Sequence, residues 1–225
     1  NYKQYTRTTD RGRRVYLDGK DKLPSVTTIL SKTKVDSDGI KAWRARVGEA
    51  EAERVMKEAA QRGSVMHEML ERYVHTNNFD TPAHDAPIAH KMANLIISKG
   101  FIYLDEIWGV EQNIAYPNEY AGTMDCVGVF RKKPTILDFK QTNKPKREEW
   151  VEDYYLQLTA YICAHEKQYG KIDGGTILMA STGLVFQEFE LSGSKLDEYK
   201  DKWWKRVEEF KTNHAQPRQE SLQKV

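Results

Sequence analysis

Hydrophobic and polar positions along the chain follow two different periods, and the changes of period mark the predicted elements. Between about residues 26 and 99 the apolar residues recur every three to four positions, which predicts helices. From 104 to 141 they alternate, which predicts strands near 104–115, 119–131 and 134–141. Helical spacing returns at 150–167. The pattern then predicts strands at 175–181 and 184–190 and a last helix at 193–212. This order predicts an α/β fold with helices around a sheet.

The N-terminal quarter of the chain predicts smaller elements. Residues 4–18 alternate around Asp10-Arg11-Gly12, which is typical of a hairpin. Pro24-Ser25 then opens a short helix, and residues 38–60 predict a charged helix. Gly63-Ser64 interrupts that pattern, and we expect Ser64 to cap a new helix. The division expected is a hairpin and helical appendage over 1–60 and a core over 61–225, together forming one compact unit.

Composition limits the classes of protein to consider. The chain has 225 residues, 39% of them hydrophobic and 30% charged, and its mean hydropathy is −0.74. These values indicate a water-soluble protein without a membrane span. The two cysteines, Cys126 and Cys163, are too few for a disulfide framework or a four-thiolate metal site, which favours a reducing compartment. A net charge of +2 does not decide whether the partner is anionic.

Candidate chemistry gathers in the hairpin over residues 122–140, GTMDCVGVFRKKPTILDFK. If its loop centres on Lys132-Lys133, Asp125 stands opposite Lys140. Side chains then alternate between faces. One face would carry Asp125, Val127, Val129, Ile136, Asp138 and Lys140, and the other Met124, Cys126, Phe130, Leu137 and Phe139. A loop of odd length would shift the register by one residue and separate Asp125 from the other two charged groups.

This hairpin is apolar on both faces, so helices should cover both. Burying a carboxylate or an ammonium there costs several kcal/mol unless another charge compensates. A hard divalent cation held by Asp125 and Asp138 is one such compensation. The spacing alone is equally compatible with an Asp–Lys salt bridge that performs no chemistry.

Further motifs help to decide between a metal site and a salt bridge without chemistry. They are LPSVTTIL at 23–30, Gly63-Ser-x-x-His67, Gly122-Thr-x-Asp125, Leu137-Asp-x-Lys140 followed by KPK, and Gln157-x-x-x-Tyr161. With these motifs in this order, residues 15–165 resemble the PD-(D/E)XK nuclease superfamily. Within its RecB-like branch, they are most similar to the mitochondrial genome maintenance exonucleases and related phage exonucleases. Two positions differ from the pattern of this family. Met124 stands where the PD-(D/E)XK name has proline, and Gln141 follows Lys140 where the branch usually has threonine.

The resemblance implies a restriction-endonuclease-like core in which helices flank a central mixed sheet. It also implies that Asp125, Asp138 and the main-chain carbonyl of Phe139 bind Mg2+ or Mn2+. Lys140 would orient or deprotonate the attacking water. His67 would be a further metal ligand that favours Mn2+. Its alternative is a hydrogen-bonded core histidine.

Four other residues have open roles. Glu71, one helical turn after His67, either orients that ring or is solvated. Glu111 either reaches the metal site or faces the surface. Gln157 and Tyr161 share a helix face and, by the resemblance, contact DNA or the lysine, while core packing of Tyr161 is the alternative.

The surroundings of the site are basic. Seven cationic residues and one acid lie between Arg131 and Arg147, which suits a polyphosphate chain. The predicted DNA-binding residues are Gln141, Thr142, Lys144, Lys146 and Arg147. The N-terminal stretch adds cations and aromatics that suit a single strand or simply pack: Lys3, Arg7, Arg11, Arg13, Arg14, Tyr2, Tyr5 and Tyr16.

Together these features predict a divalent-metal-dependent DNA exonuclease that prefers single-stranded DNA and acts in replication, repair or recombination. Two alternatives remain open: a structure-specific endonuclease, and an inactive nucleic-acid-binding module on the same fold. The expected partner is DNA, with no membrane. The expected compartment is the mitochondrial matrix or the cytoplasm of a phage-infected cell.

Overall fold

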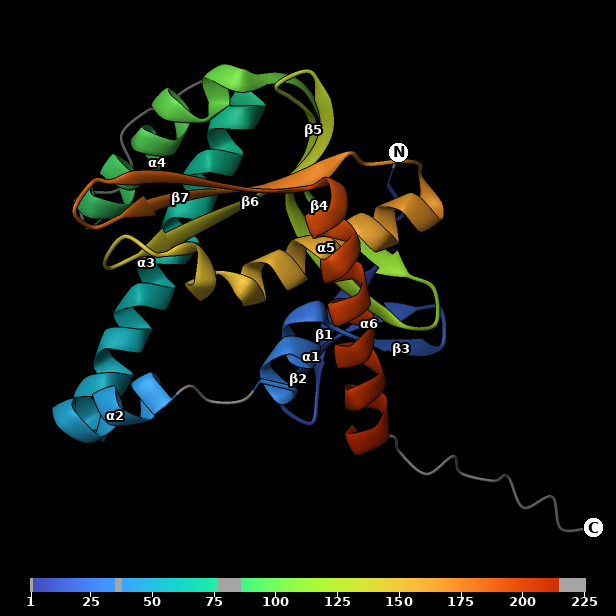
Figure 1. The fold of residues 1–225 in the computed structure, drawn as a ribbon, viewed down its shortest axis with the longest axis horizontal. Helices are drawn as coiled ribbons and strands as arrows, with labels where there is room; N and C mark the ends of the chain where they lie inside the picture. The colour runs from blue at the N-terminus through green and yellow to red at the C-terminus, as the bar shows by residue number, and fades with distance from the viewer. Residues whose placement is uncertain (1, 35–37, 77–85, 215–225) are drawn as a thin grey trace, which may run out of the picture.

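A five-stranded sheet forms the centre of the protein (Figure 1). The computed structural model describes residues 2–34, 38–76 and 86–214. In their order across the sheet, the strands are β4 (Leu104–Tyr116), β5 (Tyr120–Phe130), β6 (Lys133–Thr142), β7 (Gly174–Ser181) and β8 (Phe186–Ser192). β6 and β7 are parallel, and the other neighbours are antiparallel. The sheet is therefore mixed, as expected.

Helices cover both faces of this sheet (Figure 1). On one face, α3 (Glu49–Thr76) and α4 (Pro87–Lys99) pack Met66 and Ile96 against Leu137 of β6. On the other face lie α5 (Glu152–Gln168), which connects β6 to β7, and α6 (Gly193–His214). The predicted α/β architecture is confirmed. A sheet buried on both faces explains why β6 and β7 consist mostly of apolar residues.

The β5–β6 turn differs from the prediction by one position. It consists of Arg131-Lys132, with φ angles of 49° and 67°, and Phe130 pairs with Lys133. Positive φ at both central residues is the two-residue type I′ geometry that matches strand twist. The register consequently shifts by two residues, which places Asp125 opposite Asp138 rather than opposite Lys140. A shift of two residues does not by itself move any side chain to the other face.

The alternation fails at one predicted position. Met124 packs with Val127 in the cluster on the α5 side, whereas Cys126 belongs to the cluster on the α3 side. Opposite this point, Glu111 adopts a φ of 48°, which interrupts the regular extended backbone of β4. The β4–β5 register is unchanged here, with Val110 paired to Cys126 and Gln112 to Met124, so no inserted residue accounts for the position of Met124.

The N-terminal segment forms a second sheet, made of β1 (Thr6–Asp10), β2 (Arg13–Asp18) and β3 (Asp21–Pro24). The hairpin was predicted, but β3 was not. Buried Leu23 pairs with Tyr16 and joins a small core with Ala115 and Ala121 of the central sheet. The predicted short helix is α1 (Val26–Lys32), in which the hydroxyl of Ser25 accepts a hydrogen bond from the amide of Thr28.

The helical region that follows breaks at a different glycine from the one predicted. α2 (Asp38–Val47) ends before Gly48, which has a φ of 85°, whereas α3 continues without interruption through Gly63-Ser64. The Ser64 hydroxyl donates to the carbonyl of Ala60 one turn earlier, so it does not cap a helix. α3 also runs across residue 60, and the proposed division of the chain there stays a prediction. Within the described ranges, no helix is both long and apolar enough to cross a membrane.

Candidate active site

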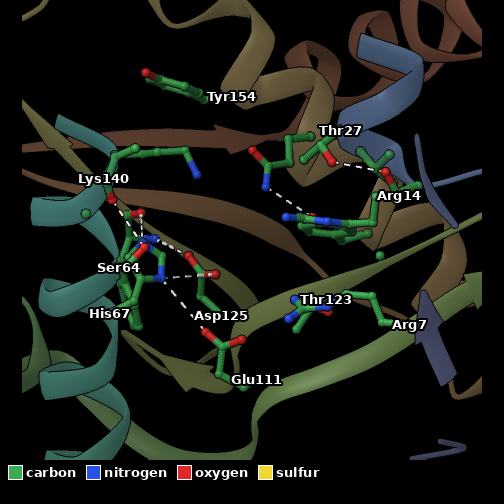
Figure 2. A pocket seen from close by; sticks show the side chains of 18 of the residues that line it. Arg7, Arg14, Thr27, Ser64, His67, Glu111, Thr123, Asp125, Lys140 and Tyr154 are labelled. Atoms are coloured by element: carbon green, nitrogen blue, oxygen red, sulfur yellow. Dashed lines mark hydrogen bonds and ion pairs between the residues drawn. The ribbon is translucent and has the colours of Figure 1, made fainter. Parts of the chain in front are cut away.

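A cavity of about 470 Å³ opens between α3, the ends of β5 and β6, α5 and the N-terminal sheet. Figure 2 shows His67, Glu111 and Asp125 facing one another on one side of it, with Lys140 nearby. These four side chains come from α3, β4, β5 and β6. Residues that are up to 73 positions apart in the chain thus meet in one pocket.

His67 is oriented by the main chain of β6. Its Nε2 donates a hydrogen bond of 2.8 Å to the carbonyl oxygen of Phe139. This bond leaves Nδ1 directed at two carboxylates, 3.5 Å from Oδ1 of Asp125 and 3.8 Å from Oε1 of Glu111. A histidine held at one nitrogen by a carbonyl, with the other nitrogen facing acids, has the usual arrangement of a metal ligand.

Asp125 is held in the same way. The amide nitrogen of Phe139 donates a 2.7 Å hydrogen bond to Oδ2 of Asp125, so Oδ1 remains directed at His67. One residue, Phe139, therefore fixes both groups through its own main chain. The predicted carbonyl ligand of Phe139 lies at this point, where it accepts the hydrogen bond from His67.

Three ligand atoms, one each from His67, Glu111 and Asp125, all lie within 4.8 Å of one another. An imidazole nitrogen with two carboxylate oxygens is a donor set that suits divalent cations such as Mn2+. Although burial disfavours charge on the ring, Asp125 and Glu111 raise the pKa of His67 to about 9. The cluster therefore attracts positive charge.

The predicted metal ligand Asp138 forms an ion pair with Lys140 on β6; Lys140 lines the pocket, whereas Asp138 is neither among the described lining residues nor in the ligand cluster. The carboxylate of Asp138 is only 1% exposed, and Lys140 Nζ lies 2.5 Å from its Oδ2. Oδ1 of Asp138 has no hydrogen-bonding partner among the described residues. Burial raises the pKa of Asp138, against the opposing charge of Lys140. Burial lowers the pKa of Lys140, but Asp138 and Asp125 outweigh it and the net shift is upward.

The α5 side of the pocket is formed by aromatic and amide groups. Gln157 Nε2 donates to the hydroxyl of Tyr161 at 3.0 Å, and the Tyr161 ring is buried against Gly122. A Cβ at Gly122 would lie 2.5 Å from Cε1 of Tyr161, so this strand position needs glycine. Tyr154 covers Lys140, whose Nζ lies 5.1 Å from the ring centre. The Gly-Thr-x-Asp and Gln-x-x-x-Tyr motifs therefore meet physically.

The predicted DNA-binding residues are less concentrated than expected. Gln141 lines the pocket, but its amide bonds to α3, donating to the carbonyl of Ala59 and accepting from Arg62. Thr142 is buried, and its hydroxyl donates to the carbonyl of Lys144. In the part of the chain that is described, the residues lining the pocket do not include Thr142, Lys144, Lys146, Arg147 or Glu71.

The pocket includes residues that motif reading did not assign to the site. Arg7 and Arg14 of the N-terminal sheet line it, as do Thr123 and Tyr154. Thr123 could have been found, because it precedes Asp125 by two positions on the same strand. The sequence had marked both arginines, among other N-terminal cations, as suited to a nucleic-acid strand, but it could not place them in this pocket, because their position depends on how a separate sheet docks.

Comparison with known proteins gives a consistent result. No protein-family model matches the chain. Over 208 residues the chain is 28% identical to mitochondrial genome maintenance exonuclease 1 of Mus musculus and 26% identical to that of Homo sapiens, covering 85% and 84% of this chain. Over 100 residues, 41% of this chain, it is 31% identical to that of Xenopus tropicalis. The curated homologues of this chain are mitochondrial genome maintenance exonucleases.

The resemblance predicted from the motifs is thereby confirmed. The chain spans 60%, 28% and 58% of the mouse, frog and human proteins. Solved structures are more distant. The structure of SSO0001 matches with a TM-score of 0.40 at 14% identity, and the match covers 86% of each chain. The structure of a protein from Eubacterium rectale matches with a TM-score of 0.46 at 13% identity, and the match covers 71% of this chain and 69% of that one.

Proposed function

We propose that this chain is a divalent-metal-dependent DNA exonuclease that prefers single-stranded DNA. The observation that carries this proposal is the convergence of His67, Glu111 and Asp125 within 4.8 Å, in the same pocket as Lys140. Relatives over 85% and 84% of the chain are named genome maintenance exonucleases, which supports the same reaction and a role in replication, repair or recombination of DNA.

The residues present fit a divalent cation. His67, Glu111 and Asp125 would hold it, whereas Asp138, whose buried Oδ1 has no hydrogen-bonding partner among the described residues, is not part of this cluster. Glu111 is thus one of the proposed ligands. The main chain of Phe139 supports the set through its hydrogen bonds with His67 and Asp125. Bound there, Mg2+ or Mn2+ would lower the pKa of a water molecule and neutralise charge on the phosphate.

Lys140 has the position expected of the group that handles the attacking water. Its ammonium is held by Asp138 and covered by Tyr154, yet it lines the pocket. From there, Nζ orients water by hydrogen bonding and stabilises the negative charge that develops on the phosphate. Asp138 keeps this side chain extended toward the pocket.

The pocket has room for one part of a nucleic-acid strand. A cavity of about 470 Å³ is in the range of small-molecule sites and accommodates a nucleotide-sized group. The relatives' names also favour the mitochondrial location over the phage-infected cytoplasm.

A timed digest tests the proposal. End-labelled linear and covalently closed circular single strands are incubated with Mg2+, with Mn2+ and with EDTA. We expect linear strands to be degraded only with metal, and circles to remain intact. Asp138→Ala, prepared in parallel, should be inactive, because activity that persists in it or in EDTA reveals a contaminant. Cleaved circles would instead establish an endonuclease, and DNA binding without degradation would establish an inactive binding module.

A further inference from the structure

The N-terminal sheet forms the pocket wall across from the proposed metal ligands. The hydroxyl groups of Tyr16 and Thr123 form a 2.9 Å hydrogen bond, which ties β2 to β5 two residues before Asp125. Arg7 pairs with Tyr16 across β1 and β2, and Thr9 pairs with Arg14. Because side chains alternate along each strand, Arg7, Arg14 and Tyr16 share the face that this bond docks.

Both arginines point toward the cavity. Each lines the pocket, and Figure 2 shows them on the side away from His67, Glu111 and Asp125. The two walls of one cavity therefore carry opposite charge.

These arginines also differ from the lysines of the same sheet. Lys3 forms an ion pair with Asp18 at 2.5 Å, and Lys22 forms one with Asp10 at 3.1 Å. Neither Arg7 nor Arg14 forms an ion pair or a side-chain hydrogen bond with any described residue, and both are exposed. Their guanidinium groups are thus available to an anion from solution.

We propose that Arg7 and Arg14 bind a backbone phosphate of the nucleic-acid strand, separate from the phosphate that is hydrolysed at the acidic cluster. This inference rests on the proposed function. Guanidinium groups bind phosphate oxygens in bidentate geometry, and such contacts position a strand without reading its sequence. A strand held on both sides of the cavity has its reacting phosphate placed against Lys140 and the carboxylates.

The test is the affinity for fluorescein-labelled oligo(dT), measured by fluorescence anisotropy in EDTA at several salt concentrations. In Arg7→Ala/Arg14→Ala we expect Kd to rise at least about fivefold at low salt. The slope of log affinity against log salt should become shallower by about 0.7, the value expected when the protein neutralises one phosphate fewer on a single strand. Both side chains are exposed, so the double variant should keep the thermal unfolding curve of the wild type.

Two further variants sharpen the result. Arg11→Ala/Arg13→Ala removes two exposed charges from the same hairpin, from residues that are not among those lining the pocket. Arg7→Lys/Arg14→Lys keeps the charge and should restore the salt slope. If the double alanine variants at the two sites have the same affinity and slope while wild type binds and degrades DNA, only this inference falls. If wild type neither binds nor degrades, the proposed function falls and this inference with it.

Discussion

The two walls of the pocket differ in charge and in how firmly their side chains are held. The acidic wall, defined by His67, Glu111, Asp125 and Lys140, comes from the central sheet and α3, and its groups are held by hydrogen bonds or ion pairs, including the pair of Lys140 with buried Asp138. The basic wall, defined by Arg7 and Arg14, comes from a small peripheral sheet, and its side chains are exposed and unpaired within the described structure.

Because of this difference, we expect the acidic wall to control the rate of hydrolysis and the basic wall to control the affinity for the nucleic acid. Chemistry at phosphorus needs groups placed in advance, because reorganising charges during the reaction costs free energy. Attraction of a polyanion needs only accessible positive charge. Changes at the acidic wall should therefore reduce turnover, whereas changes at the basic wall should reduce affinity and its salt dependence.

The largest effect is expected from Asp125→Ala. This change removes a proposed ligand and the partner of the Phe139 amide, so affinity for Mn2+ should fall more than about 100-fold and degradation of linear strands should stop. Calorimetric titration with Mn2+ and the digest measure the two effects. Asp105→Ala, at an exposed acid paired with Lys132, is the control and should behave like wild type. Unchanged Mn2+ binding in Asp125→Ala would remove it from the ligand set.

Lys140→Ala separates chemistry from binding on the same wall. Turnover should fall by about 10² to 10⁴-fold, the range for losing a group that handles a proton, while affinities for Mn2+ and DNA stay within about threefold. Single-turnover digestion at saturating protein gives the rate, and circular dichroism verifies folding, because Asp138 loses its ion-pair partner. Lys99→Ala, at an exposed lysine in the last turn of α4 that is not among the described pocket-lining residues, serves as the control. Equal rates in the two variants would refute the role.

Gly122→Ala tests whether packing holds the acidic wall in place. The added methyl group would meet the ring of Tyr161 at 2.5 Å, so the free energy of unfolding should decrease by about 1–3 kcal/mol. Urea denaturation measures it. Gly183→Ala has its nearest contact at 3.8 Å and should change stability by less than about 0.5 kcal/mol. Equal stability of both variants would show that the Tyr161 contact is not tight.

Among the changes at the acidic wall, the smallest effect is expected from His67→Ala. Removing one of several ligands should weaken Mn2+ binding about tenfold and shift the preference toward Mg2+, because imidazole favours the transition metal. Competition titrations of the two metals measure this. His75→Ala, exposed later on the same helix, provides the comparison. A preference identical in both variants would return His67 to a structural role.

Much of the arrangement of the charged groups on the β5–β6 hairpin was predictable, because it depends on regularities over a few neighbouring residues. Period-two alternation and an even-length turn place Asp125, Asp138 and Lys140 together, and the correction from Lys132-Lys133 to Arg131-Lys132 changes the partners but not the face. The helix break was harder to place. Gly48 and Gly63 look alike in the sequence, and packing of Met66 and Leu70 carries α3 through the second glycine.

The chain's pattern of residues was sufficient for the order of strands and helices and for the hairpin that carries the acids, since each follows from neighbours a few residues apart. The position of Glu111 and the basic wall were settled by packing. The φ of 48° at Glu111 arises where β4 and β5 pair, and Arg7 and Arg14 reach the pocket through the bond between Tyr16 and Thr123, 107 residues apart. Contacts over such separations depend on how whole sheets dock, which no local periodicity records.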